Sequence, residues 1–336
     1  MTFDKDLNDM TLSLTRYFKI SLLGLVILLA GCHHQPTTTD NLEAPAVISE
    51  MSKHGIIEQP KQWSALVKQT NHGKNVKTVR ELSAILQQGN RHSFATDSPK
   101  ALEQLNYPSI SNVSGHQVLN VPTFFSADSK KTNKYQQQLR NLLKTVSHQQ
   151  TLILNFAHNQ GGDYYPMIAG LAAIIPKGVL WSEVDNADRG KQVVMTATQI
   201  HGGLLGNSYR FPASHAAIHK QVVVITDSRT GSAAEMTIMA LKRNPQVTTI
   251  GVPTAGYTSV NKGRVAKSKK TAAILTIGTI TSPVKIGNQR HFNNEPLKPD
   301  LTTMYAPISP AKGEQYQKQQ PLDTDFWHEL EKHLSE

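Results

Sequence analysis

Two strand–turn–helix units stand out in the pattern of apolar and polar positions along the chain. In the first, an apolar run over 151–157 passes through a glycine-containing turn into a helical pattern over 165–175. In the second, an apolar run over 221–227 leads through another turn into a helical pattern over 232–243. Short apolar runs of this kind are typical of buried parallel strands joined by crossover helices. The pattern therefore predicts an α/β fold with both turns at the carboxyl edge of one sheet, where binding sites usually lie.

The remaining elements surround these two units. Apolar residues at helical spacing predict helices within 44–88, and a strand over 118–125 precedes one more helix. A stretch over 180–215 is rich in glycine and polar residues, and we interpret it as a cap over a site. A strand over 272–280 and a helix near Trp327 complete the pattern.

The amino-terminal segment has the pattern of an export leader. An apolar run over 20–30 has the length of a signal-peptide core and is too short for a membrane-spanning helix of ~20 residues. It ends in Leu29-Ala30-Gly31-Cys32, which resembles the bacterial lipobox. The resemblance implies cleavage before Cys32 and a diacylglycerol on its sulfur. We therefore expect a protein anchored by lipid to the extracytoplasmic face of the cell membrane, on the periplasmic side if the cell has an outer membrane.

The amino-acid composition limits the partners and the cofactors that the chain is expected to bind. The 336 residues carry 35 lysines and arginines against 25 aspartates and glutamates, and a net charge of +10 suits anionic membrane surfaces or cell-wall polymers. Only 6% of the residues are aromatic, which does not favour a base-stacking surface, so nucleic acid is not predicted as a partner. Cys32 is the only cysteine, which excludes intramolecular disulfides and cysteine-based metal sites. His215 and His219 lack the glutamate of a zincin motif, so no metal or cofactor is predicted.

The start of the second helix is a candidate nucleophile position. Ser232 lies where free backbone amides and the positive end of a helix dipole converge, which favours a developing oxyanion. Its small neighbours leave the hydroxyl accessible, as in a nucleophile elbow. The alternative is that Ser232 only caps the helix, with Glu235 as the other half of a capping box. The glycine pair in the first turn favours a site, because backbone can approach a ligand closely there.

Three ordered segments resemble the tail-specific (C-terminal-processing) serine proteases. Residues 155–162 (Asn-Phe-Ala-His-Asn-Gln-Gly-Gly) resemble the family's Asp-x-Arg-x-Asn-x-Gly-Gly. Residues 230–235 (Thr-Gly-Ser-Ala-Ala-Glu) resemble its nucleophile segment, and residues 251–256 (Gly-Val-Pro-Thr-Ala-Gly) its Gly-Glu-Pro-Thr-x-Gly. The likeness is strongest to the nisin-resistance type. It is carried by Arg-His-Ser-Phe at 91–94, Gly-Gly-Asp-Tyr-Tyr-Pro-Met at 161–167, Thr-Gly-Ser at 230–232 and Ala-Gly-Tyr-Thr-Ser-Val-Asn at 255–261. No motif is decisive alone, but the ordered set is specific and covers most of the mature chain.

The resemblance implies a fold and a set of roles. The fold is α/β, with a crotonase-like tail-specific protease core, an N-terminal helical domain and a cap, and without a PDZ domain. Ser232 would be the nucleophile, and His92 the general base that takes the hydroxyl proton and returns it to the leaving amine. Glu235 and Glu295 are candidates for a carboxylate that orients His92, and a plain Ser–His dyad is the alternative. The other implied site residues are Ala233, Gly161 and Gly162 in the oxyanion hole, and Asn159, Tyr257 and Thr230 in substrate binding.

Three departures from the family pattern matter. Many members use a Ser–Lys dyad, but Tyr257 occupies the position of that lysine, which leaves His92 as the available base. Asn155 and Ala157 replace the usual aspartate and arginine of the glycine segment, which leaves loop anchoring open. No PDZ-like insertion separates His92 from the core, so the cap and the helical domain are expected to grip the substrate.

The sequence thus predicts a lipid-anchored, extracytoplasmic serine endopeptidase that cleaves peptides near their C-terminus. The most specific version of this prediction is that it cleaves nisin-like lantibiotics and so confers resistance to them. A housekeeping protease that processes exported proteins and a non-catalytic peptide-binding lipoprotein of the same fold are the alternatives. The predicted domains, in chain order, are a lipoprotein signal peptide (1–31), a polar tether (32–43), an N-terminal helical domain with a His-bearing loop (44–115), an α/β protease core with a cap at about 180–215 (116–310), and a C-terminal helix (311–336).

Overall fold

A computed structural model of the chain describes residues 43–146, 151–214, 221–265, 271–308 and 321–335. The predicted leader, the lipidation site Cys32, most of the tether and the pair His215 and His219 lie outside the described residues. In the part of the chain that is described, no helix combines the length and the apolar character needed to cross a membrane.

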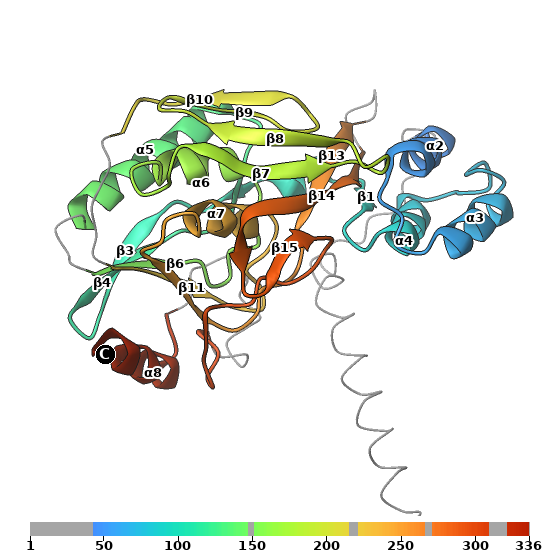
Figure 1. The fold of residues 1–336 in the computed structure, drawn as a ribbon. Helices are drawn as coiled ribbons and strands as arrows, with labels where there is room; N and C mark the ends of the chain where they lie inside the picture. Colours follow the sequence, from blue (N-terminus) through green and yellow to red (C-terminus); the bar gives the residue numbers. More distant parts are fainter. Residues whose placement is uncertain (1–42, 147–150, 215–220, 266–270, 309–320, 336) are drawn as a thin grey trace, which may run out of the picture. The chain divides into compact units, whose positions relative to one another are not determined.

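A six-stranded sheet forms the centre of the α/β core (Figure 1). Its order is β16-β12-β11-β6-β4-β3, with β3 antiparallel to β4 and all other neighbours parallel. The strands are β3 (Ser109–Val113), β4 (His116–Asn120), β6 (Thr151–Asn155), β11 (Gln221–Thr226), β12 (Val247–Gly251) and β16 (Leu301–Thr302). Leu152 and Leu154 of β6 belong to one apolar cluster, whereas Ile153 between them belongs to another. Both faces are therefore buried, which explains the continuous apolar run in the sequence.

Helices cover both faces of this sheet (Figure 1). On one face lie α5 (Ser129–Val146), α6 (Tyr164–Gly170) and α7 (Ala233–Leu241), and on the other lies α8 (Thr324–Ser335). Phe326 and Trp327 of α8 are almost fully buried against Ile153 and its neighbours. Every residue of α7 is buried. An α/β core with crossover helices and a C-terminal helix is what the sequence predicts.

A second, eight-stranded antiparallel sheet lies over α5, α6 and α7 (Figure 1). Its order is β1-β14-β7-β8-β9-β10, and β13 and β15 pair with β14. The strands are β1 (Phe94–Thr96), β7 (Gly178–Val184), β8 (Gly190–Met195), β9 (Gln199–Gly202), β10 (Asn207–Arg210), β13 (Ser259–Val265), β14 (Ala272–Ile286) and β15 (Gln289–Phe292). The segment predicted as a cap, 180–215, supplies only β7 to β10. The covering layer is larger than predicted because β1 and β13 to β15 join it from distant parts of the chain.

The described N-terminal part is helical, as predicted, with α2 (Ala44–His54), α3 (Pro60–Gln69) and α4 (Val79–Gly89). A capping box of Thr78 and Glu81 starts α4. Gly89 ends this helix, and a Cβ there would lie 2.8 Å from the ring of Trp63, so glycine permits the close packing of α3 on α4.

The junction between the helical part and the core differs from the predicted boundary at 115/116. β3 already belongs to the central sheet, and β1 pairs with β14. The predicted strand over 118–125 is divided, because β4 ends before Pro122 and β5 (Phe124–Phe125) pairs instead with β2 (Gln104–Leu105). A short 3-10 helix (Pro99–Leu102) precedes β2.

Candidate active site

The two turns singled out in the sequence meet at the carboxyl edge of the central sheet, where β6 and β11 are parallel neighbours. The N–H of Gly231 donates a hydrogen bond to the carbonyl of Asn159 at 2.9 Å, which ties the second turn to the first. A Cβ on Gly161 would lie 2.7 Å from the nitrogen of Ala233 and 2.8 Å from Cβ of Ser232. The glycine turn therefore lies directly against the start of α7, and only glycine fits there.

Ser232 occupies a strained position at the N-terminus of α7. Its φ of 54° and ψ of −121° are unusual for a residue with a side chain. Such strain is typical of functional positions, including the nucleophile elbow of other hydrolases. Ser232 is partly exposed, whereas Ala233 and the rest of α7 are buried. The geometry thus presents one hydroxyl at the positive end of a buried helix.

Glu235 holds the backbone around Ser232 in place. Its carboxylate is fully buried and accepts hydrogen bonds from the N–H groups of Ser232 (2.7 Å), Tyr257 (2.8 Å) and Gly256 (2.9 Å), and from the hydroxyl of Thr254. Burial raises the pKa of Glu235 to about 7, and these hydrogen bonds oppose the rise. The Glu235 half of the predicted capping box is therefore present, and it also fixes the loop that carries Tyr257.

Two backbone amides near Ser232 are available to an oxyanion. Within the described residues, neither Ala233 nor Gly162 donates its N–H to another group of the chain, whereas the N–H of Gly161 donates to Oδ1 of Asn159 at 2.9 Å. Gly162 is exposed, and its φ is +107°. A Cβ on Gly162 would lie 2.1 Å from the carbonyl oxygen of Phe124, so this position also requires glycine. Of the three residues predicted for the oxyanion hole, Ala233 and Gly162 are the better placed.

His92 lies in the loop after α4, as predicted, and this loop is anchored to the core. Asn90 is fully buried, and its side-chain oxygen accepts the N–H of His92 at 3.0 Å. The guanidinium of Arg91 donates to the carbonyl of Gly256 at 2.6 Å and also to that of Asn294. Since Gly256 precedes Tyr257, the histidine loop is tied to the same segment that Glu235 holds.

The imidazole of His92 contacts three side chains. Nδ1 lies 2.8 Å from Oγ of Ser259, and the amide nitrogen of Asn261 lies 3.2 Å from Nδ1 and 3.4 Å from Nε2. The ring of Tyr257 packs on it with centroids 4.5 Å apart. The same tyrosine ring would lie 3.3 Å from a Cβ on Gly231, the residue before Ser232. Tyr257 thus connects the histidine loop to the serine turn.

The environment of His92 favours the neutral imidazole. Burial, and then the charge of Arg91, lower its pKa to about 4. Among the described residues, neither candidate carboxylate binds the ring, because Glu235 binds backbone amides and Glu295 binds Gln289 at 3.0 Å. Polar neutral groups, Ser259 and Asn261, occupy that place instead.

Asn159 and Thr230, predicted to bind substrate, are fully buried. The amide of Asn159 donates to the carbonyl of Val121 at 2.8 Å, and the hydroxyl of Thr230 donates to that of Phe156 at 2.9 Å. Their side chains are engaged within the chain, so we assign them to positioning the two turns rather than to substrate contact. Of the three predicted substrate-binding residues, only Tyr257 is partly exposed.

The substitution of Asn155 for the usual aspartate leaves the glycine segment anchored. Oδ1 of Asn155 accepts the N–H of Ala157 at 2.9 Å, and its amide donates to Asn120 at 3.1 Å. A second anchor, Asp227, accepts the N–H of His158 at 3.0 Å and lies 3.2 Å from its imidazole. The first turn is thus held to the second without an arginine at position 157.

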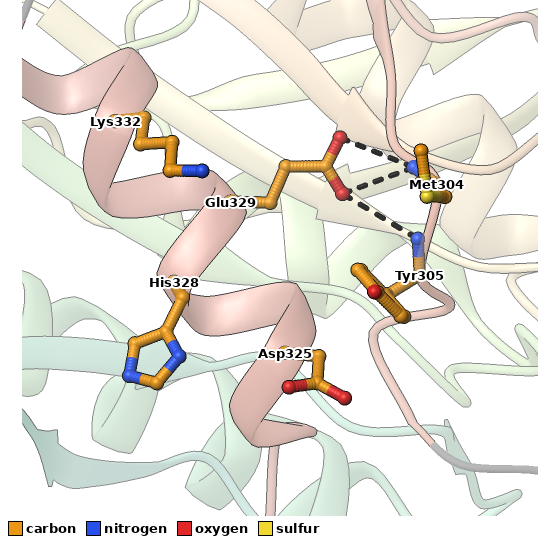
Figure 2. A pocket seen from close by; sticks show the side chains of 6 residues that line it. All are labelled: Met304, Tyr305, Asp325, His328, Glu329 and Lys332. Carbon is orange, nitrogen blue, oxygen red and sulfur yellow. Dashed lines mark hydrogen bonds between the residues drawn. The ribbon is translucent and has the colours of Figure 1, made fainter.

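Two further features lie apart from this chemistry. Figure 2 shows a surface pocket at α8 in which Glu329 accepts the N–H groups of Met304 and Tyr305. Its lining residues are Met304, Tyr305, Asp325, His328, Glu329 and Lys332, and none of the predicted site residues is among them. Within the described residues, no group of three or more histidine, aspartate, glutamate or cysteine side chains could hold a metal ion.

Comparison with known proteins identifies the family. Residues 117–303, more than half of the chain, match Peptidase family S41. The chain therefore belongs to this family of serine-type peptidases, the tail-specific proteases that its motifs resemble. It is 26% identical over 275 residues to the nisin-resistance protein of Lactococcus lactis subsp. lactis, a match that covers 78% of this chain and 83% of that protein.

Two solved structures share the fold. A lipoprotein from Streptococcus agalactiae is similar with a TM-score of 0.64 and 22% identity, over 85% of this chain and 98% of that one. A protein from Parabacteroides merdae is similar with a TM-score of 0.52 and 13% identity, over 84% of this chain and 93% of that one. The predicted fold class, an S41 protease core with an N-terminal helical part and a covering layer, is confirmed.

Sequence reasoning missed the side chains that surround His92. Ser259 and Asn261 lie within the segment 255–261 that carries the family resemblance, but a motif does not show which side chains face a histidine 167 residues away. The antiparallel pairing of β13 with β14 supplies that information, because it places Ser259 opposite Thr279 and brings the start of β13 to the histidine loop.

Proposed function

We propose that this S41 peptidase is a lipid-anchored, extracytoplasmic serine endopeptidase that cleaves peptides near their C-terminus with Ser232 as nucleophile and His92 as general base. The main support is a cluster of linked groups. Gly161 packs against Ser232, Glu235 binds the N–H groups of Ser232 and Tyr257, and the ring of Tyr257 packs on His92. It joins a strained hydroxyl, free backbone amides and a neutral imidazole, the three components that acyl transfer requires.

The proposed reaction follows from these groups. The Ser232 hydroxyl attacks the scissile carbonyl while Nε2 of His92 takes its proton, and the N–H groups of Ala233 and Gly162 donate to the oxyanion. The protonated imidazole then gives the proton to the leaving amine, and the carbonyl re-forms as an acyl-enzyme. Water, deprotonated by His92, hydrolyses the ester and frees Ser232. A low pKa keeps His92 unprotonated and ready to accept the first proton.

Ser259 and Asn261 would orient the base. If Nδ1–H of His92 donates to Ser259 Oγ at 2.8 Å, the lone pair lies on Nε2, the nitrogen needed for proton transfer. Asn261 is itself fixed, since its Oδ1 accepts the hydroxyl of Thr276 at 2.9 Å. In this arrangement the hydroxyl oxygen of Ser259 takes the acceptor place that a carboxylate holds in a Ser–His–Asp triad.

The substrate proposal rests on the relative and on the leader. The similarity to a protein named for nisin resistance supports a lantibiotic-like antimicrobial peptide as substrate. A lipid on Cys32 would hold the enzyme at the membrane surface where such cationic peptides act. The net charge of +10 does not favour their long-range attraction, so recognition would be local.

Cleavage of defined peptides tests this proposal. The purified full-length chain is incubated with nisin and with a pool of linear decapeptides, and products are identified by mass spectrometry beside Ser232→Ala and His92→Ala. We expect cleavage near the C-terminus that falls by ~10³-fold or more in both variants. If the peptides bind equally to all three proteins and none of the proteins cuts them, the result would favour a non-catalytic, peptide-binding lipoprotein over a protease. Cleavage of linear peptides without nisin would favour a housekeeping protease.

A further inference from the structure

A carboxylate lies immediately beside the candidate oxyanion hole. Asp163 follows the exposed Gly162, and its N–H donates to the carbonyl of Phe124 at 2.8 Å, which fixes it at the end of the glycine turn. Asp163 is two positions after Gly161, whose Cα packs against Ser232. Two residues span at most about 7 Å of chain, so Asp163 is within reach of the residues of a substrate that flank the scissile bond.

This carboxylate differs from the other shielded carboxylates of the core in its lack of partners. Within the described residues, the Asp163 side chain accepts one hydrogen bond, from the N–H of Tyr165 at 2.9 Å, and forms no ion pair. The buried Glu183 accepts two hydrogen bonds, from Nε1 of Trp181 at 3.2 Å and from the N–H of Leu204 at 2.7 Å, and Glu235 accepts four. Burial raises the pKa of Asp163 to about 6, and among the described residues no cation forms an ion pair with it. A shielded charge without a cationic partner is costly, so a cation from outside the chain is expected.

A stack of aromatic rings begins at the two residues that follow Asp163. Tyr164 and Tyr165 pack with centroids 4.4 Å apart, and Tyr209 of β10 stacks on Tyr165 at 5.7 Å. All three rings are partly exposed. Tyr209 is linked to Asp163 through Tyr165, which stacks on Tyr209 and whose N–H donates to the carboxylate. Burial, and then the charge of Asp163, raise the pKa of Tyr209 to about 12. Tyrosine faces attract cations, and the attraction strengthens where water is excluded.

Capping of α6 explains only part of this arrangement. Asp163 is the N-cap of α6, and its bond to Tyr165 N–H is the capping bond. Asparagine caps a helix as well as aspartate does, so capping does not require the charge. It also does not account for the ring of Tyr209, which β10 stacks on Tyr165.

We propose that Asp163, together with the rings of Tyr165 and Tyr209, forms a subsite that binds the ammonium or guanidinium group of a lysine or arginine side chain in the peptide substrate. This subsite rests on the proposed peptidase function, since it places the cationic residue near the bond that Ser232 attacks. It also gives an otherwise positive chain a local means to recognise cationic peptides.

Paired peptides test the subsite. One linear peptide that the full-length chain cleaves is remade with lysine or norleucine at each of the four positions on either side of the cut, and kcat/KM is measured for each pair. We expect lysine to be preferred at one position by about 10- to 100-fold, the range of a charge-assisted hydrogen bond. Asp163→Asn retains the cap and should bring this ratio to near 1. Asp325→Asn, an equal charge change on α8, should leave the ratio unaltered.

Two results would overturn the subsite. One is the absence of a lysine preference at every position in the unmodified chain. The other is an Asp163→Asn variant that slows both members of a pair equally and keeps their ratio, because that is the behaviour of a purely structural cap.

Binding separates this proposal from the peptidase proposal. If the unmodified chain cuts no peptide, the dissociation constants of fluorescent lysine and norleucine peptides are measured on Ser232→Ala with and without Asp163→Asn. A lysine preference that Asp163→Asn removes would support the subsite although the peptidase proposal had failed. Equal constants for the two peptides, or no binding of either, would overturn the subsite as well.

Discussion

The imidazole of His92 and the hydroxyl of Ser259 lie 2.8 Å apart, although 167 residues separate them in the chain. This contact joins the loop after α4 to the start of β13, and Asn261 on the same strand contacts the ring as well. It gives His92 a defined orientation without a carboxylate. The proposed mechanism therefore requires Ser259, which is not the nucleophile, to orient His92.

Ser259→Ala should lower kcat by about 10²-fold with little change in KM, because misplacement of a catalytic base by about 1 Å has an effect of that size. Steady-state kinetics on the peptide that is cut fastest measures both constants. Ser282→Ala, which removes another buried hydroxyl of the same sheet, is the matched control and should retain activity. Equal kcat values for the two variants would exclude an orienting role for Ser259.

His92 should remain neutral down to about pH 4, because burial and the charge of Arg91 lower its pKa. A proton NMR titration, with the His92 resonance identified by its loss in His92→Gln, measures this directly. Asn261→Asp places a negative charge beside the ring and should raise that midpoint, since an anion favours the imidazolium. A midpoint near the ordinary value of about 6.5 in the unmodified chain would contradict the described environment.

Gly161→Ala should abolish peptidase activity, because the added Cβ would lie 2.7 Å from the nitrogen of Ala233 and 2.8 Å from Cβ of Ser232. Gly115 is the matched control, since its φ is +83° and a Cβ there meets nothing within 4 Å. Gly115→Ala should cost about 1 kcal/mol of stability through its backbone conformation and keep activity. Thermal unfolding and cleavage assays on both variants separate the effect of backbone strain from that of the steric clash at position 161. An active Gly161→Ala variant would mean that the oxyanion hole lies elsewhere.

Glu235 should make stability depend on pH. Its pKa is raised from 4.5 to about 7 by burial, so the folded state binds the proton more tightly than the unfolded state. The resulting stabilisation is full below pH 4.5 and is lost as pH rises to about 7, a change of about 3 kcal/mol. Glu235→Gln cannot titrate, so urea unfolding at pH 5 and pH 8 should show a smaller loss in the variant. An identical loss in both proteins would mean that Glu235 titrates normally.

Local patterns were sufficient to predict the central unit of this fold. The apolar runs that form β6 and β11 could be predicted as buried strands, because strands buried on both faces contain few polar residues. The glycine turn and Ser232 follow those strands directly, so their meeting at one sheet edge could be expected. Within the described residues, the N–H groups of Ala233 and the exposed Gly162 have no acceptor, and their role in an oxyanion hole stays a prediction.

Long-range pairing could not be predicted in the same way. Half of the residues of β8 are exposed, and β10 has none that is buried, so the hydrophobic signal of these strands is weak. The pairing of β14 with β1, β7, β13 and β15 joins segments from both ends of the chain. For the same reason the contacts of His92 with Ser259 and Asn261, and of Tyr165 with Tyr209, emerge only from the folded structure.

The central claim is that His92 activates Ser232, and the rate of covalent labelling by a fluorophosphonate probe tests it most directly. Intact-mass spectrometry of the full-length chain should show one adduct, located at Ser232 by peptide mapping and absent from Ser232→Ala. His92→Ala should label at least 10²-fold more slowly, since the serine loses its general base. Labelling at a different residue, or an equal rate in His92→Ala, would contradict the Ser–His mechanism.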